Sequence, residues 1–124
     1  MRLAPLLFLL LSCLASASAV TPKEAKANAD KSEASLPASE LTRLTQLQGQ
    51  LAASAFPACA QRTGSAPETF TVVVELSPAG AVVNSWLLGG TAFAQCFREA
   101  MVRSFTYRPP NAPFFTAFEY THAR

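Results

Sequence analysis

The sequence is poor in the side chains from which catalytic sites are built. Its 124 residues contain a single histidine, and only 15% of them are charged. The one aspartate, Asp30, lies in a polar stretch near the N-terminus, and the histidine, His122, lies near the C-terminus. The glutamates of the predicted folded domain are spread over different elements, so no close carboxylate pair is expected for acid–base chemistry. We therefore expect a protein that is not an enzyme.

Motifs for cofactors, metals and nucleic acids are also lacking. Gly89-Gly90 is too short for a phosphate-binding loop, and no lysine follows it. Two cysteines and one distant histidine do not supply four zinc ligands at finger spacing. The formal net charge is only +2, and the cationic residues are scattered, whereas nucleic-acid binding needs clustered lysine and arginine. We expect no cofactor, no metal ion and no nucleic-acid partner.

The N-terminal residues have the pattern of a secretory signal. Arg2 provides a positive start, residues 3–11 are apolar apart from one proline, and residues 17–19 form a cleavage site of small side chains. The apolar run is shorter than the roughly 20 residues that span a bilayer. We expect residues 1–19 to be a signal peptide and the protein to be exported to the periplasm, the cell envelope or the extracellular space.

A second processing site competes with the first. The sequence Leu10-Leu11-Ser12-Cys13 resembles a bacterial lipobox, with leucine three residues and serine one residue before the cysteine. At such a site Cys13 becomes the lipidated first residue, and its lipid anchors the protein to a membrane. The two alternatives remain open on the sequence, and they change the location of the protein rather than its fold.

The cysteines indicate one disulfide. Of the three cysteines, Cys13 is either removed with the leader or lipidated. Cys59 and Cys96 then remain as a pair in an oxidising compartment, where thiols tend to be oxidised. A disulfide between them closes a loop of about 38 residues, which the chain-entropy model values at roughly 3–4 kcal/mol. Two buried free thiols are the alternative.

Residues 20–38 have the composition of a polar flexible linker. Alanine, lysine, glutamate, serine and asparagine dominate, and large apolar residues are almost absent. Such a stretch buries too little surface to offset the entropy lost on ordering, although its alanine, lysine and glutamate allow marginal helix. We expect the folded domain to occupy residues 39–124.

The domain is expected to begin with an amphipathic helix. Ser39 is a natural N-cap, and apolar residues recur every three or four positions from Leu41 to Leu51. Pro57 lacks a backbone donor and disfavours helix at the preceding residue. We therefore expect a break there, followed by a short helical turn that ends near Gly64.

Two strands, a second helix and a last strand follow. Alternating apolar residues predict strands over 68–76 and 81–88, and the turn residues at 77–80 join them in a hairpin. Thr91 can cap the next helix. After a proline-rich loop, residues 114–121 are expected to form the third strand.

The connections predict the order of the strands. The helix after the second strand returns the chain along the sheet, so the third strand can pair antiparallel with the first, in the order two, one, three. A parallel neighbour of the second strand through a right-handed crossover is the alternative. We prefer the antiparallel order, which suits a short sheet. The expected fold is α+β: an N-terminal helix followed by β-β-α-β, with a three-stranded antiparallel sheet covered by helices on one face and one disulfide.

Particular residues accompany this order of elements. They are the valine-rich strand 71–76, Ala81-Val82-Val83 after a glycine-containing turn, Cys96 in the helix, Phe105 after it, and Pro113-Phe114 with Phe118 in the closing strand. With Cys59 ahead of the first strand, this pattern over about residues 56–121 resembles the TonB C-terminal domain superfamily, most closely its two-cysteine branch in gliding-motility proteins of the AgmX/PglI type. The resemblance implies a protein-binding domain.

The energy-transducing members of that superfamily have an uncleaved N-terminal membrane helix and a long proline-rich spacer. This sequence has a cleavable leader pattern and a short spacer. We therefore do not expect it to couple a proton gradient to transport.

A three-stranded sheet leaves two edges to which an extended peptide can add a strand. The third strand is the candidate edge, and the candidate partner-binding residues are Phe115, Ala117, Glu119 and Thr121. The expected partner is an unknown envelope protein or peptide, with membrane contact only through a lipid on Cys13. A structural or assembly lipoprotein of the envelope is one alternative function. A small secreted enzyme or inhibitor that depends on His122 is another.

Overall fold

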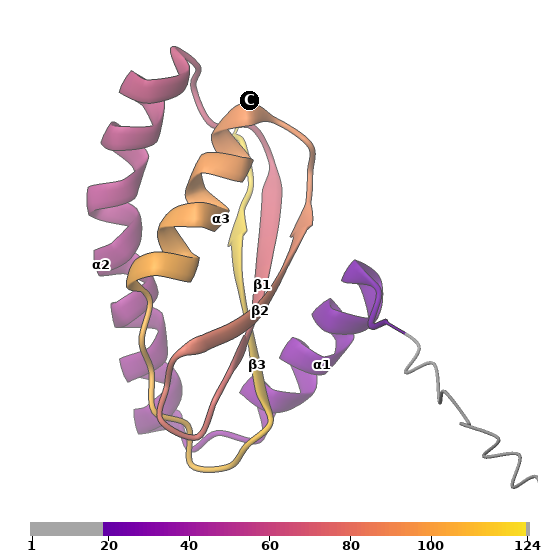
Figure 1. The fold of residues 1–124 in the computed structure, drawn as a ribbon. Helices are drawn as coiled ribbons and strands as arrows, with labels where there is room; N and C mark the ends of the chain where they lie inside the picture. Colours follow the sequence, from indigo (N-terminus) through magenta and orange to yellow (C-terminus); the bar gives the residue numbers. More distant parts are fainter. Residues whose placement is uncertain (1–18, 124) are drawn as a thin grey trace, which may run out of the picture.

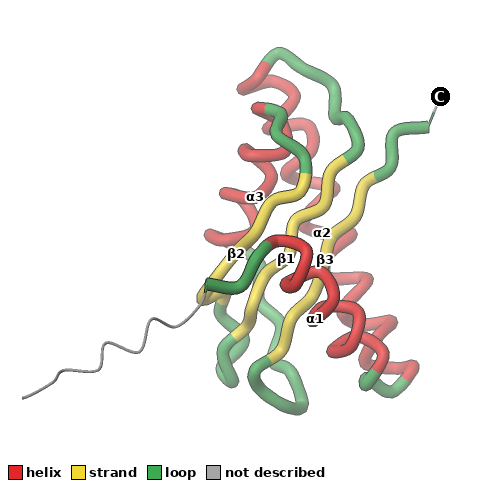
Figure 2. Tube along the Cα trace, turned by 90° about the vertical axis from the view of Figure 1, so that its right-hand side faces the viewer, coloured by secondary structure: helices red, strands yellow, loops and turns green. Residues whose placement is uncertain are grey.

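The computed structural model describes residues 19–123, in which a three-stranded sheet lies between helices on both faces (Figures 1 and 2). The elements are α1 (Pro22–Ala34), α2 (Ala38–Thr63), β1 (Phe70–Leu76), β2 (Val82–Leu88), α3 (Ala92–Ser104) and β3 (Phe114–Tyr120). No helix in this range is long and apolar enough to cross a membrane. Nearly all of the predicted signal peptide, with the lipidation candidate Cys13, lies outside the described residues.

The sheet has the expected order, β2-β1-β3, and both pairs of strands are antiparallel. The predicted α+β class is therefore confirmed. At the centre of the register, Val73 lies opposite Trp86 on β2 and opposite Ala117 on β3. An irregularity between Glu75 and Leu76 shifts the β1–β2 register by one residue. Val82 consequently packs towards the main core together with Leu76.

The main core fills the space between the sheet and the layer formed by α2 and α3. Phe70, Val72, Val74 and Leu76 alternate along β1 and are buried on this side. Phe56 of α2 lies at the centre of an aromatic cluster, with ring centroids 5.3–6.3 Å from its neighbours. Those neighbours are Phe70, Phe93, Phe97, Phe118 and Tyr120.

The predicted disulfide is present. Cys59 of α2 and Cys96 of α3 are bonded, with their Cα atoms 5.7 Å apart and both side chains buried. This separation lies in the usual range for a disulfide. The bond joins the two helices of one layer covalently.

The predicted break of the first domain helix at Pro57 is wrong. The helix α2 begins at Ala38, after Pro37 rather than at a Ser39 cap, and it continues through Pro57 to Thr63. Pro57 is exposed while Phe56 and Cys59 are held in the core, so the missing backbone bond lies where water can solvate the unpaired carbonyl. The helix ends as expected at Gly64, whose φ of 67° is left-handed.

The prediction of a flexible linker over residues 20–38 is wrong for residues 22–34. They form α1, which packs on the sheet face opposite α2 and α3 (Figure 2). Ala25 and Ala29 are fully buried there against Val73 and Ala117. Alanine side chains let the helix approach the sheet closely, and the sheet supplies the larger apolar surfaces that make the burial favourable. Helices therefore cover both faces of the sheet, not one.

Candidate partner-binding edge

The predicted partner-binding residues lie where an incoming strand could pair. The strand β3 is at one edge of the sheet, and it contains Phe115, Ala117 and Glu119, while Thr121 follows its last residue. In an antiparallel pair, successive residues direct their backbone N–H and C=O alternately towards the partner strand and away from it. The hydrogen bonds made at Phe115 and Ala117 show that these residues direct their backbone groups away from β1.

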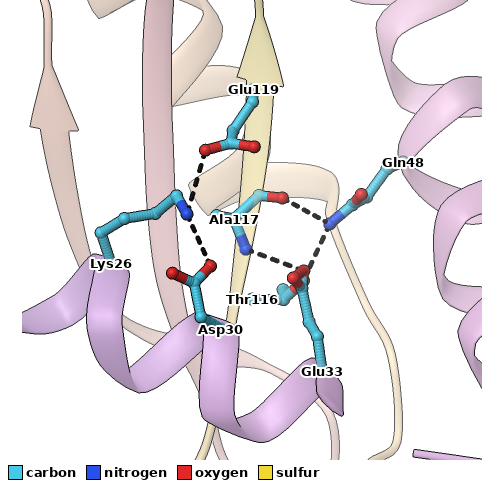
Figure 3. Close-up of polar contacts among 7 residues, drawn as sticks. All are labelled: Lys26, Asp30, Glu33, Gln48, Thr116, Ala117 and Glu119. Carbon is cyan, nitrogen blue, oxygen red and sulfur yellow. Dashed lines mark hydrogen bonds and ion pairs between the residues drawn. The ribbon is translucent and has the colours of Figure 1, made fainter.

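Side chains from α1 and α2 bind these outward groups, and Figure 3 shows the bonds at Ala117. The amide of Phe115 donates to Ser32 Oγ at 3.1 Å, and the amide of Ala117 donates to Glu33 Oε1 at 3.3 Å. The carbonyl of Ala117 accepts from Gln48 Nε2, also at 3.3 Å. Three backbone atoms of the edge strand thus have partners of the kind that a neighbouring strand would provide.

The hydroxyl of Thr116 connects these side chains. Thr116 is fully buried, and its Oγ1 donates to Glu33 Oε1 at 2.8 Å and accepts from Gln48 Nε2 at 2.9 Å. Glu33 and Gln48 therefore each contact both Thr116 and Ala117, and they join α1 and α2 around the edge of the sheet. A buried hydroxyl without partners would be costly, so this network also favours one position of the strand.

Burial raises the pKa of the Glu33 carboxyl above its usual value. The hydrogen bonds from Thr116 and from the Ala117 amide act in the opposite direction, because they stabilise the carboxylate, but burial has the larger effect. The charged form of Glu33 is thus less favourable at this edge than in water. A neutral acceptor in the same place would not carry this cost.

An ion-pair cluster lies farther along the same edge. Lys26 Nζ contacts Asp30 and lies 3.1 Å from Glu119 Oε1 (Figure 3). The hydrogen bond to Asp30 is the main cause that raises the pKa of Lys26, and Glu119 adds to it. Because both carboxylates are largely exposed, each pair contributes no more than about 1 kcal/mol. The cluster therefore adds little to the stability of the docked α1.

The helix α1 crosses the sheet from β2 to β3. Near its N-terminal end, the indole Nε1 of Trp86 donates to the carbonyl of Val20 at 3.0 Å. Phe115 is on the same face as Trp86, with ring centroids 5.7 Å apart, whereas Phe114 faces the main core. Both Trp86 and Phe115 are half-buried beside α1. The sheet thus has an apolar surface next to its β3 edge.

The remaining chemical candidates do not gather around this edge. His122 is exposed beyond β3, and its backbone amide donates to Thr69 Oγ1. Within residues 19–123, no three histidine, cysteine, aspartate or glutamate side chains group in a way that could hold a metal ion. The arrangement at β3 is suited to holding backbone groups through hydrogen bonds.

Reading the sequence alone missed Ser32, Glu33 and Gln48. A signal for the helix that carries two of them is nevertheless present. Thr21 and Glu24 have capping-box spacing, with proline at the first helical position, and the Thr21 hydroxyl accepts from the Glu24 amide. The contact of this helix with β3 had no comparable signal in the sequence.

No protein-family model, curated protein or solved structure matches the chain.

Proposed function

We propose that this protein is an exported, non-catalytic protein-binding module of the cell envelope, which binds an extended segment of a partner by adding a strand to β3. One observation carries the proposal: the outward backbone atoms of Phe115 and Ala117 are bonded by side chains in the places where a strand would bond them. The carbonyls and amides of an extended peptide can make the same hydrogen bonds. Ser32, Glu33 and Gln48 act as intramolecular substitutes for that peptide.

The contacts that hold α1 on the sheet are weak enough for a binding peptide to displace this helix. Its fully buried side chains are only Ala25 and Ala29, so it contributes little apolar surface of its own. Its Glu33 carboxylate has a raised pKa because it is partly desolvated, whereas a peptide would present neutral carbonyls to the same amides. Replacing α1 by a strand therefore removes the cost of burying a charge.

The surface beside the edge indicates the kind of segment that binds. When α1 moves away, Trp86 and Phe115 become available next to β3. The side chains of an added strand alternate between the two faces of the sheet. We therefore expect a partner segment with apolar or aromatic residues at alternate positions, because these would cover Trp86 and Phe115 after α1 has left.

Two features support placement outside the cytoplasm. The N-terminal residues have a secretory-signal pattern. The structure also has a disulfide between Cys59 and Cys96, and structural disulfides persist mainly in oxidising compartments.

A displayed library of random peptides, selected on the oxidised protein, tests the proposal. Ala117→Pro removes the outward amide from the edge, and it should weaken the selected peptides at least about tenfold, because a pairing donor is lost and the ring blocks the strand. Ala117→Ser keeps the amide and serves as the matched control. Circular dichroism verifies that both variants are folded.

The double substitution of Ser32→Ala and Glu33→Ala should have the opposite effect. It removes the α1 side-chain bonds to the edge, so a larger fraction of the protein has β3 available and the apparent affinity rises. Isothermal titration with one selected peptide measures both changes. Peptides that bind folded Ala117→Pro as tightly as the unmodified protein would exclude β3 as the binding edge.

A further inference from the structure

The other edge of the sheet, β2, is more open than β3. The alternation established at β3 implies that Val73 directs its backbone groups to Trp86, so Ser85 and Leu87 direct theirs away from β1. Within the described residues, only one of these outward atoms has a partner: the Ser85 carbonyl accepts from Arg98 Nη2 at 3.1 Å. The Ser85 amide and both backbone groups of Leu87 receive no such bond.

A guanidinium is held in position at this open edge. Arg98 of α3 also donates from Nε to Ser85 Oγ at 2.9 Å, so two bonds to one residue of β2 orient its planar group. Arginine has five N–H donors in a fixed arrangement. The remaining donors can therefore bind an acceptor that approaches β2 from outside without a further loss of side-chain freedom at Arg98.

Next to Arg98, the outer surface of α3 is hollowed and basic. The hollow has a volume of about 330 Å³ and is lined by Gln95, Arg98, Glu99, Val102 and Arg103. Val102 is 46% exposed. Among residues 19–123, no carboxylate lies within ion-pair distance of Arg98 or Arg103. The one acid in the hollow, Glu99, is paired with Arg62 of α2 at 3.7 Å.

We propose that the β2 edge and this hollow of α3 form a second partner-binding surface, which takes an extended segment with acidic side chains at alternate positions. The backbone of the segment pairs with the outward groups of Ser85 and Leu87. The side chain of Ser85 points to the α3 side, and cross-strand neighbours point to the same side. A carboxylate opposite Ser85 therefore comes close to Arg98.

The charge of the surface argues against a second copy of this chain as the occupant. Antiparallel pairing of two β2 edges about Ser85 would bring the Arg98 side chains of both copies to the same side of the joint sheet. Like charges at that distance are unfavourable. An acidic segment of a different protein has the complementary charge. This surface is independent of the β3 edge, since each surface uses a different strand of the sheet.

Nuclear magnetic resonance on the oxidised protein tests the inference with two capped peptides. One peptide alternates glutamate with valine and threonine, and the matched peptide has lysine in place of glutamate. We expect the acidic peptide to shift the amide signals of Ser85 and Leu87 and to slow their hydrogen exchange, and to bind at least about fivefold tighter than the lysine peptide. Equal affinities would overturn the proposal.

Variants separate the backbone from the charge. Ser85→Pro should abolish the binding because it removes the outward amide, while Ser85→Ala keeps that amide. Arg103→Glu lies on the exposed surface of α3, where the fold tolerates it, and it should weaken the acidic peptide about fivefold to tenfold. Unchanged affinity in Arg103→Glu, or in folded Ser85→Pro, would overturn the proposal.

Two further outcomes of the resonance experiment would overturn the proposed β2 surface. A shift confined to the Phe115 and Ala117 amides would move the site to β3, which overturns this inference and supports the proposed function. Protection of the Ser85 amide that grows with protein concentration in the absence of peptide would mean self-association through β2, and it too would overturn the inference.

Discussion

Removal of the disulfide should cost about 4 kcal/mol of stability. Cys59 and Cys96 are separated by 37 residues in the sequence. A loop of about 38 residues gives an entropy difference of roughly −13 cal/mol/K for the unfolded chain, which is about 4 kcal/mol at 25 °C. Small domains usually have stabilities of about 5–15 kcal/mol, so the double substitution of Cys59→Ala and Cys96→Ala should bring this protein close to the limit of folding.

Urea unfolding followed by circular dichroism measures this effect. The variant should have a lower midpoint and a steeper dependence on urea, because its unfolded chain is less compact and exposes more surface. For a domain of about 105 residues, a loss of 4 kcal/mol corresponds to a fall in the unfolding temperature of about 18 °C. The unmodified protein in reductant provides a second measurement and should unfold like the variant.

In this model the disulfide stabilises the protein by constraining the unfolded chain, so the variant and the reduced protein should lose the same stability. A loss below about 1 kcal/mol in both the variant and the reduced protein would show that closing this loop does not constrain the unfolded chain as the model requires. A large loss in the variant alone would instead point to the packing of the Cys59 side chain, which is 2% exposed.

Three further predictions concern single residues. Burial raises the pKa of Glu33 above the usual value of 4.5, so the folded protein binds the Glu33 proton more tightly than the unfolded chain does. The stability that this provides is present below pH 4.5 and is lost as the pH rises through the raised pKa. Urea unfolding at several pH values should show this dependence, and Glu33→Gln should remove it. The Tyr107 hydroxyl donates to Glu40 Oε2 at 2.7 Å and has a pKa raised to about 12, mainly by burial, so the unfolding free energy should fall between about pH 10 and pH 12. Tyr107→Phe should lose that slope and cost about 1.5–3 kcal/mol in urea unfolding at neutral pH; an unchanged slope would contradict the assignment. Gly80→Ala should cost about 2 kcal/mol, because Gly80 has a φ of 96° and a Cβ there would lie 2.8 Å from the Tyr107 carbonyl oxygen. Gly49→Ala, with open space around it in α2, should instead stabilise by about 1 kcal/mol, and equal thermal shifts in the two variants would argue against the stated cause.

The sheet could be predicted because alternating side chains are a local pattern in the sequence, and the disulfide could be predicted from the number of cysteines. Alternation along β1 places Phe70, Val72, Val74 and Leu76 on one face without any knowledge of what covers that face. The strand order followed from the lengths and directions of the connections. The disulfide followed from parity, since two cysteines remained once Cys13 was assigned to the leader or to a lipid.

The candidate site was predictable only as a location. The sequence placed Phe115, Ala117 and Glu119 on an edge strand, which the sheet order confirms. It did not indicate that the edge is covered, because the covering residues Ser32 and Glu33 are more than 80 positions away in the chain. Hydrogen bonds over such separations have no periodic pattern in the sequence.

Taken by itself, the sequence therefore determined the classes and order of the elements from residue 39 onwards and the pairing of Cys59 with Cys96, since these depend on side-chain periodicity, turn residues and cysteine number. Only the tertiary structure decided that residues 22–34 are a helix docked on the sheet and that Pro57 lies inside a continuous helix. Both depend on what lies opposite in space. Ala25 and Ala29 have little apolar surface to lose, and they become core residues only because the sheet brings Val73 and Ala117 against them.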